Sequence, residues 1–165
     1  MIIRVNSLKE GYQEYSSPVD LVEVDIVEKE FSFPVSITLQ IEKFKSQINV
    51  HGILHTKLDL ICDRCLEHFE MKIDPEFDVI FKVSTHRRHN VEDEVRVISP
   101  FENELDIAQD IKDALILSIP MKKLCHEDCR GICPGCGANL NYEECRCNFQ
   151  RIDPRWEVLK ALTTK

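Results

Sequence analysis

The sequence predicts an α+β protein: a mainly antiparallel β-sheet or open barrel, then a helix, then a C-terminal cysteine-rich module with a short terminal helix. Three observations support this prediction. Apolar and polar residues alternate through most of the first hundred residues, as in strands with one buried face. A later segment repeats its apolar residues with helical spacing, and six of the eight cysteines lie within residues 125–147.

The alternating segments predict seven strands. These cover residues 1–5, 19–31, 34–44, 46–62, 68–74, 77–83 and 95–99. Val22, Val24 and Ile26 would share one face of the second strand. We expect Gly52 to form a β-bulge in the fourth strand, and Pro75 to mark an edge or a break between the fifth and sixth strands.

A helix is predicted over about residues 106–118. Ile107, Ile111 and Leu115 recur at i, i+4 and i+8, and Asp106 is a suitable N-cap. Near the C-terminus, "DPRWEVLKAL" has an Asp cap followed by Pro at the first helical position, which predicts a short terminal helix from Asp153 onward.

The eight cysteines form four close pairs. The pairs are Cys62 with Cys65, Cys125 with Cys129, Cys133 with Cys136, and Cys145 with Cys147. A Cys-x-x-Cys at a tight turn brings two thiolates to one point, and structural zinc takes four such ligands in a tetrahedron. The pairs therefore predict one or two four-cysteine zinc sites. The i, i+4 spacing of Cys125 and Cys129 would place both thiolates on one face of a helical turn.

The spacing favours one combination of pairs without deciding it. Residues 133–147 close a short loop at little entropic cost, so their four cysteines would form one site. Cys62 and Cys65 would then join Cys125 and Cys129 across the chain. A cross-braced exchange of pairs stays open, as does an iron–sulfur cluster in place of zinc.

Other uses of the thiols are less favoured. The N-terminus has no export signal, so we expect a cytoplasmic protein with reduced thiols rather than disulfides. "CPGC" lacks the βαβ context of a redox motif, and four thiolates leave no open position for catalysis. We find no motif of a hydrolase or nucleotide-binding enzyme, and no apolar run long enough to cross a membrane. The sequence therefore predicts no catalytic residue, no membrane association and no small-molecule substrate.

We divide the chain into a strand-rich domain with one helix, residues 1–120, and a zinc-binding module, residues 121–165. The module is expected to pack on the domain and share a site with the Cys62–Cys65 hairpin. Of the formal net charge of −8, the domain carries −10 and the module +2. The acidic domain argues against broad polyanion binding. Four arginines in the module are candidate contacts to phosphate or carboxylate groups: Arg130, Arg146, Arg151 and Arg155.

Four segments resemble one protein family. "LICDRCLEHFE", "CRGICPGCGANLN", "CRC" and "DPRWEVLKAL", in this order behind a strand-rich half, resemble the YceD family, also called the large ribosomal RNA subunit accumulation protein family. The resemblance implies a small, non-enzymatic cytosolic factor for ribosome assembly. Its partners would be pre-ribosomal RNA, ribosomal proteins or other assembly factors. The alternative is a zinc-containing thiol oxidoreductase or an RNA-processing enzyme.

Overall fold

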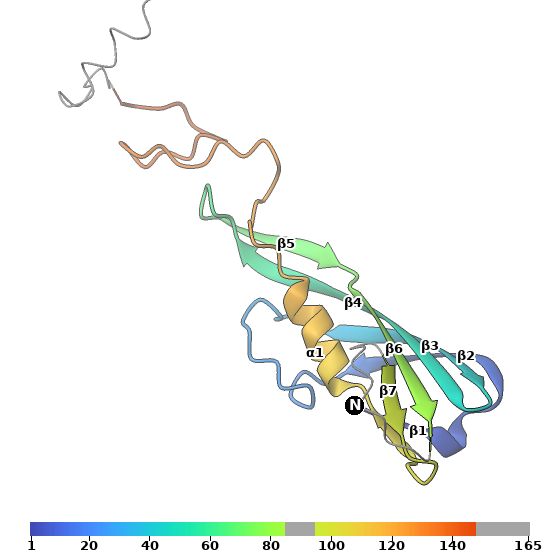
Figure 1. Cartoon of the computed structure of the whole chain (residues 1–165). Helices are drawn as coiled ribbons and strands as arrows, with labels where there is room; N and C mark the ends of the chain where they lie inside the picture. Colours follow the sequence, from blue (N-terminus) through green and yellow to red (C-terminus); the bar gives the residue numbers. More distant parts are fainter. Residues whose placement is uncertain (85–94, 148–165) are drawn as a thin grey trace, which may run out of the picture.

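The computed structural model describes residues 1–84 and 95–147. Within these residues it has mostly antiparallel strands, one α-helix and a C-terminal cysteine cluster, which confirms the predicted fold class. The molecule is elongated, with the sheet and helix at one end and the cysteine-rich segment at the other (Figure 1). The predicted helix after Asp153 lies outside the described residues.

The structure has eight strands and a short 3-10 helix in the described residues. They are β1 (Ile2–Arg4), η1 (Val5–Ser7), β2 (Gly11–Val19), β3 (Val35–Phe44), β4 (Gln47–Ile61), β5 (His68–Ile73), β6 (Glu76–Val83), β7 (Val95–Ile98) and β8 (Glu104–Asp106). The main sheet has the order β2-β3-β4-β6-β7, and β1 pairs separately with β8. All pairs are antiparallel except β6 with β7.

Strand β4 connects the sheet to the cysteines. Its first part, from Gln47, pairs with β3 on one side and β6 on the other. From Thr56 to Ile61 it pairs with β5 instead, so the two strands form a hairpin that projects beyond the main sheet (Figure 1). The 15 residues of β4 therefore carry the chain from the core to Cys62 at the hairpin tip.

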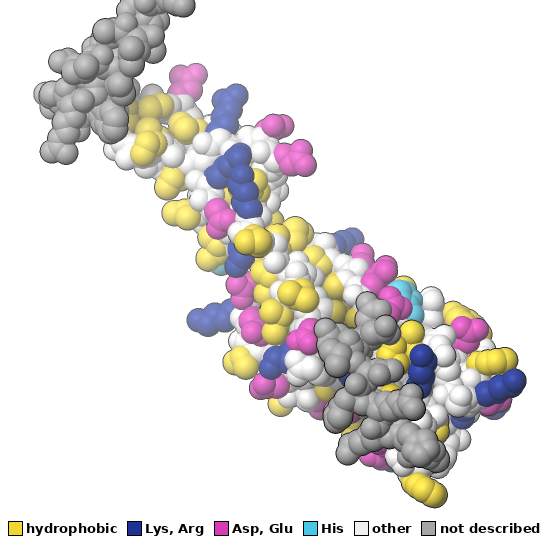
Figure 2. All heavy atoms as spheres, in the orientation of Figure 1, with side chains coloured by type: hydrophobic (Ala, Val, Ile, Leu, Met, Phe, Trp, Pro, Cys, Tyr) yellow, Lys and Arg dark blue, Asp and Glu magenta, His cyan; other side chains and the backbone are white. Residues whose placement is uncertain are grey.

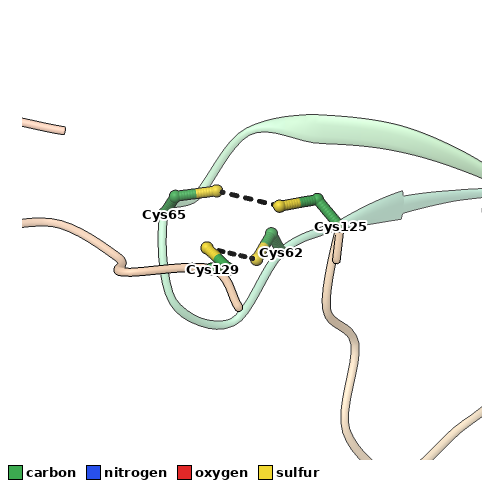
Figure 3. A group of neighbouring side chains, drawn as sticks. All are labelled: Cys62, Cys65, Cys125 and Cys129. Atoms are coloured by element: carbon green, nitrogen blue, oxygen red, sulfur yellow. Dashed lines mark hydrogen bonds between the residues drawn. The ribbon is translucent and has the colours of Figure 1, made fainter. Parts of the chain in front are cut away.

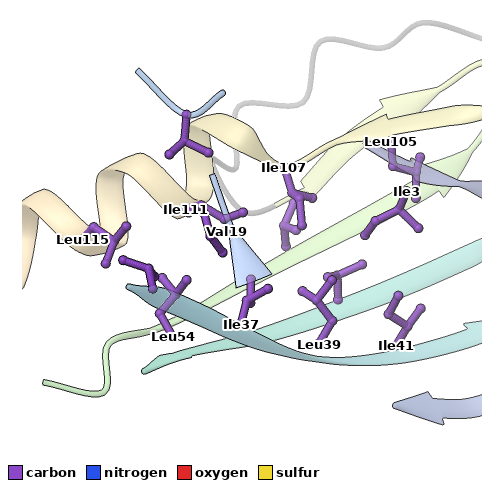
Figure 4. Packing of buried hydrophobic residues seen from close by; sticks show 14 of the residues in the cluster. Ile3, Val19, Ile37, Leu39, Ile41, Leu54, Leu105, Ile107, Ile111 and Leu115 are labelled. Atoms are coloured by element: carbon purple, nitrogen blue, oxygen red, sulfur yellow. The ribbon is translucent and has the colours of Figure 1, made fainter. Parts of the chain in front are cut away.

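The helix α1 (Ala108–Leu117) covers one face of the sheet. Ile107, Ile111 and Leu115 are fully buried and face the strands, where Ile37 and Leu54 are also fully buried (Figure 4). This contact forms the main hydrophobic core. It accounts for the helical spacing seen in the sequence.

The expected N-cap at Asp106 is one residue too early, although the Asp106 side chain does contact the start of α1. The Asp106 carboxylate accepts a hydrogen bond from the Ala108 N–H at 2.9 Å. The residue at the N-cap position itself is Ile107, and Asp106 is the last residue of β8.

The prediction of a strand over residues 19–31 is wrong beyond Val19. Asp25 has φ +53°, and the N–H of Ile26 donates to the carbonyl of Leu21, so the segment winds through turns. Val24 is 3% exposed whereas Val22 is 84% exposed, although a strand would place both on one face. The preceding segment forms β2 instead, because its backbone pairs with β3 at the edge of the sheet.

The predicted bulge at Gly52 is also wrong. Gly52 pairs in unbroken register with Leu39 on β3 and Phe77 on β6. A Cβ at this position would lie 2.4 Å from the ring of Phe77. The glycine makes room for an aromatic ring on the neighbouring strand.

Candidate metal centres

The first group of cysteines joins the hairpin tip to the segment after α1. We call Cys62, Cys65, Cys125 and Cys129 the hairpin site. The Sγ atoms of Cys62 and Cys129 are 3.8 Å apart, and those of Cys65 and Cys125 are 3.6 Å apart (Figure 3). All four sulfurs lie within 4.8 Å of one another.

A tight turn between β4 and β5 directs the first two thiols to one point. The N–H of Leu66 donates to the carbonyl of Cys62, and the N–H of Cys62 donates to that of Glu67, each at 2.9 Å. Leu66 has φ +60°, which closes the turn. Cys62 and Cys65 are both buried beneath it.

Polar contacts hold the segment after α1 against this turn. The N–H of Asp63 donates to the carbonyl of Lys123 at 2.8 Å, and the Asp63 carboxylate accepts the Lys123 N–H at 2.7 Å. The Lys123 ammonium lies 2.8 Å from the Glu30 carboxylate and lowers the pKa of that carboxyl group. These contacts bring Cys125 to the hairpin.

The second group lies within one short stretch of chain. We call Cys133, Cys136, Cys145 and Cys147 the local site. The Sγ atom of Cys133 is 3.4 Å from that of Cys145 and 3.6 Å from that of Cys147, and all four sulfurs again lie within 4.8 Å of one another. Gly137, with φ +73°, donates its N–H to the carbonyl of Cys133 and closes the Cys-x-x-Cys turn.

These distances fit a single ion held by four sulfurs. A disulfide would bring two sulfurs to about 2.0 Å. A tetrahedral zinc with Zn–S bonds of about 2.3 Å places its sulfurs about 3.8 Å apart. The four separations given above are close to that value. An iron–sulfur cluster would need more room between the thiolates for its bridging sulfides.

The electrostatics of both groups call for a cation. Burial by itself raises the pKa of Cys62, but backbone N–H groups donate to its sulfur and bring the pKa down to about 6. Burial and the neighbouring sulfurs raise the pKa of Cys125 to about 12. In the local site, backbone N–H groups lower the pKa of Cys133 to about 6, whereas burial and the other sulfurs raise that of Cys147. In each group the pKa is lowered for two of the thiols and raised for the other two, so ionisation of all four is opposed. A divalent cation would relieve that repulsion.

In the structure the pair Cys133 and Cys136 meets the pair Cys145 and Cys147, and the two remaining pairs meet each other. This is the combination that the spacing favoured, not the cross-braced exchange. The expected helical turn at Cys125 is wrong, because no helix forms there. The N–H of Cys129 donates to the carbonyl of His126 at 3.2 Å in a single turn, and the His126 Nδ1 lies 3.1 Å from the Cys125 sulfur.

Two of the four candidate arginines, Arg130 and Arg146, lie in the described residues. Arg130 is exposed, and Arg146 pairs with Glu143 at 2.5 Å. Arg151 and Arg155 lie outside the described residues. Residues 121–147 hold four basic and four acidic side chains, so the positive excess of the module comes from its last 18 residues. On the face seen in Figure 2, both signs of charge are mixed over the cysteine-rich segment.

Three residues around the hairpin site were missed by sequence reasoning. Arg64 donates to the backbone carbonyls of Glu127 at 3.0 Å and Cys129 at 2.8 Å. Gly131 packs against the Arg64 carbonyl, and Asn141 donates to the Cys129 sulfur at 3.3 Å. Arg64 lies inside "CDRC", and this position could have suggested a role at the site. Nothing in the positions of Gly131 and Asn141 in the sequence indicates such a role.

Comparisons with known proteins identify the family. A family model described as "Large ribosomal RNA subunit accumulation protein YceD" matches residues 50–163. This chain belongs to the YceD family. The match includes the cysteines of both sites.

Relatives of this chain occur in bacteria and plants. An uncharacterised protein of Mycobacterium bovis is 27% identical over 125 residues, which cover 76% of this chain and 60% of that protein. The large ribosomal RNA subunit accumulation protein YCED homolog 1, chloroplastic, of Arabidopsis thaliana is 25% identical, covering 78% of this chain and 48% of that protein. The protein of the same name in Zea mays is 25% identical, and the match covers 77% of this chain and 54% of that protein.

This YceD-family chain therefore spans about half to three fifths of the length of these relatives. No solved structure matches it. In the part of the chain that the structure describes, no helix has the length and apolar character needed to cross a membrane.

Proposed function

We propose that this chain is a non-enzymatic ribosome-assembly factor that supports the accumulation of large-subunit ribosomal RNA. The family match over residues 50–163 carries this proposal, because it includes most of β4, the helix and both cysteine sites. The names of the plant relatives point to the same role. We place the activity in the cytoplasm, with pre-ribosomal RNA, ribosomal proteins or assembly factors as partners.

We propose that the hairpin site and the local site each hold one structural zinc ion. Four thiolates at tetrahedral separations form a closed site, and a closed site is typical of structural zinc. The segment needs such support because most of its side chains are exposed or only partly buried. Structural zinc supplies on the order of 10–16 kcal/mol in small modules.

The same geometry favours a scaffold over an enzyme. A zinc ion held by four thiolates has no open position for a substrate, and its ligands are not the free thiolates typical of redox or nucleophilic cysteines. Two occupied four-thiolate sites would also leave the cysteine-rich segment with negative charge at its ligands. This charge makes contact with a basic ribosomal protein a reasonable alternative to contact with RNA through the arginines.

The test is complementation in a host strain depleted of its own YceD-family protein. We expect depletion to lower the ratio of large-subunit to small-subunit ribosomal RNA and the wild-type chain to restore it. Variants with Cys133→Ser/Cys136→Ser should restore it poorly. A ratio that does not change on depletion would refute the proposed role.

A second measurement separates the scaffold from a thiol enzyme. Native mass spectrometry should find two zinc ions per chain, and thiol reagents should react only after a chelator is added. Several rapidly reacting thiols in the untreated protein would favour the oxidoreductase instead. Crosslinking in the complemented strain would show whether RNA or protein is the direct partner.

A further inference from the structure

A side chain from the loop of the local site contacts a sulfur of the hairpin site. Asn141 lies between Cys136 and Cys145, inside the loop that the local site closes. Its Nδ2 donates to the Cys129 sulfur of the hairpin site at 3.3 Å, and its Oδ1 accepts the N–H of Arg130 at 2.8 Å. Reversing the amide would lose both bonds, so together they fix its orientation.

A short turn holds Asn141 in this position. The Asn139 side chain accepts the N–H of Asn141 at 3.0 Å, and the N–H of Leu140 donates to the carbonyl of Gly131 at 2.9 Å. Ile132 forms a β-bridge with Asn139. The turn is thus docked on residues 130–132 and belongs to the loop whose ends meet in the local site.

The other side of residues 130–132 contacts the hairpin. The N–H of Ile132 donates to the carbonyl of Arg64 at 3.0 Å. Gly131 has φ +73°, and a Cβ there would lie 2.8 Å from the same carbonyl oxygen. Residues 130–132 therefore contact the hairpin turn on one side and the Asn141 turn on the other.

Closing the local site lowers the entropic cost of placing Asn141. With the local site open, the loop from Pro134 to Glu144 gains conformational freedom, and holding Asn141 at the sulfur must offset that entropy. Cys129 is 3% exposed, so water does not replace the missing donor easily. Hydrogen bonds to metal ligands typically account for a 10–100-fold change in metal affinity.

We propose that Asn141 is a positioning residue that couples the two metal sites. Metal in the local site fixes Asn141 on the Cys129 sulfur and so raises the affinity of the hairpin site for its own ion. The coupling is reciprocal, because metal in the hairpin site favours the same docked turn. This inference rests on the proposed zinc sites and adds that the two sites load cooperatively.

The experiment measures the zinc affinity of each site in the full chain by chelator competition, read by native mass spectrometry. Cys133→Ser/Cys136→Ser leaves only the hairpin site, and Asn141→Ala is made both in this background and in the intact chain. Tyr142→Phe is the matched control. It removes a hydrogen bond from the adjacent residue to Glu67, at 3.2 Å, that does not involve a sulfur.

We expect loss of the local site to weaken zinc binding at the hairpin site about tenfold or more. Asn141→Ala alone should give a similar loss at the hairpin site, and no further loss in the Cys133→Ser/Cys136→Ser background. Tyr142→Phe should change neither affinity. Two zinc ions that bind independently, each unaffected by the variants, would overturn the coupling and leave the zinc sites intact. Failure of the wild-type chain to bind zinc would overturn both.

A measurement on the wild-type chain avoids variants that fold poorly. With both sites loaded with ¹¹³Cd, the Asn141 side-chain N–H should show scalar coupling to the ion bound by Cys129, transmitted through the N–H···S bond. Loading only the local site should order the Asn141 amide signals before the hairpin site fills. A fully loaded protein without the coupling would overturn the role of Asn141.

Discussion

At the scale of single residues, two glycines occupy positions where one added carbon would collide with a neighbour. Gly52 faces the ring of Phe77 across two strands of the main sheet. Gly131 faces the Arg64 carbonyl at the hairpin site. The first glycine permits core packing and the second permits two distant segments to meet, so their substitutions should have different consequences.

We predict that Gly52→Ala destabilises the main sheet by about 1–3 kcal/mol, because the new methyl group forces the Phe77 ring to move. Urea unfolding followed by circular dichroism measures this. Adding Phe77→Leu should recover part of the loss, since the smaller side chain leaves space. A Gly52→Ala protein as stable as the wild type would contradict the packing role.

We predict that Gly131→Ala releases zinc from the hairpin site while Gly137→Ala does not. Both glycines have φ +73°, so both substitutions carry the same backbone strain. Only at Gly131 does a Cβ meet another atom, the Arg64 carbonyl oxygen at 2.8 Å, whereas nothing lies within 4 Å at Gly137. Zinc content by native mass spectrometry compares them, and equal behaviour of the two variants would count against docking through Gly131.

At the scale of elements, β4 and α1 have different tasks. Strand β4 is long enough to belong to both the main sheet and the hairpin, so it fixes the position of the hairpin site relative to the core. Helix α1 closes the core with one face, on which Ile111 and Leu115 are fully buried. Its last residue, Leu117, is 83% exposed and contributes little to that core.

We predict that Leu115→Ala lowers the free energy of unfolding by about 2–5 kcal/mol, because it leaves a cavity between α1 and the sheet. Leu117→Ala, a matched change two residues away, should alter it by no more than about 0.5 kcal/mol. Chemical denaturation of both variants tests the pair. Similar losses would mean that α1 packs through a different face.

At the scale of the whole molecule, stability comes from two sources that lie at opposite ends. The sheet and α1 share an apolar core, whereas the second cluster consists of cysteines with a few apolar neighbours. The two ends meet at the hairpin tip and through the Lys123 contacts to Asp63 and Glu30. Loss of metal should therefore affect one end much more than the other.

We predict that chelation disorders residues 125–147 and leaves the main sheet folded. Hydrogen exchange should show lost protection in that segment and at the tip of the β4–β5 hairpin. Peptides from β3 and from the first part of β4 should stay protected, because their core does not include the cysteines. Unchanged exchange throughout, or unfolding of the entire chain, would contradict this division.

Much of the fold followed from periodicity. The helical spacing of Ile107, Ile111 and Leu115 located α1, and strict alternation located β3, β4 and β6. Alternation predicted a strand wrongly over residues 20–31, where turns bury Val24 and leave Val22 exposed. Strand β2 escaped prediction because an edge strand with mixed side chains is defined by its pairing partner rather than by its own pattern.

The close pairing of the cysteines could be read from the sequence alone, because two thiols two to four residues apart can meet in one turn whatever surrounds them. The sequence also determined the apolar face of the helix, which depends only on local spacing. Three features depend on the tertiary structure: which cysteine pairs combine, the packing of the Phe77 ring against Gly52, and the hydrogen bond from Asn141 to the Cys129 sulfur. These features depend on segments far apart in the chain, and their meeting is set by the length of β4 and the packing of the core.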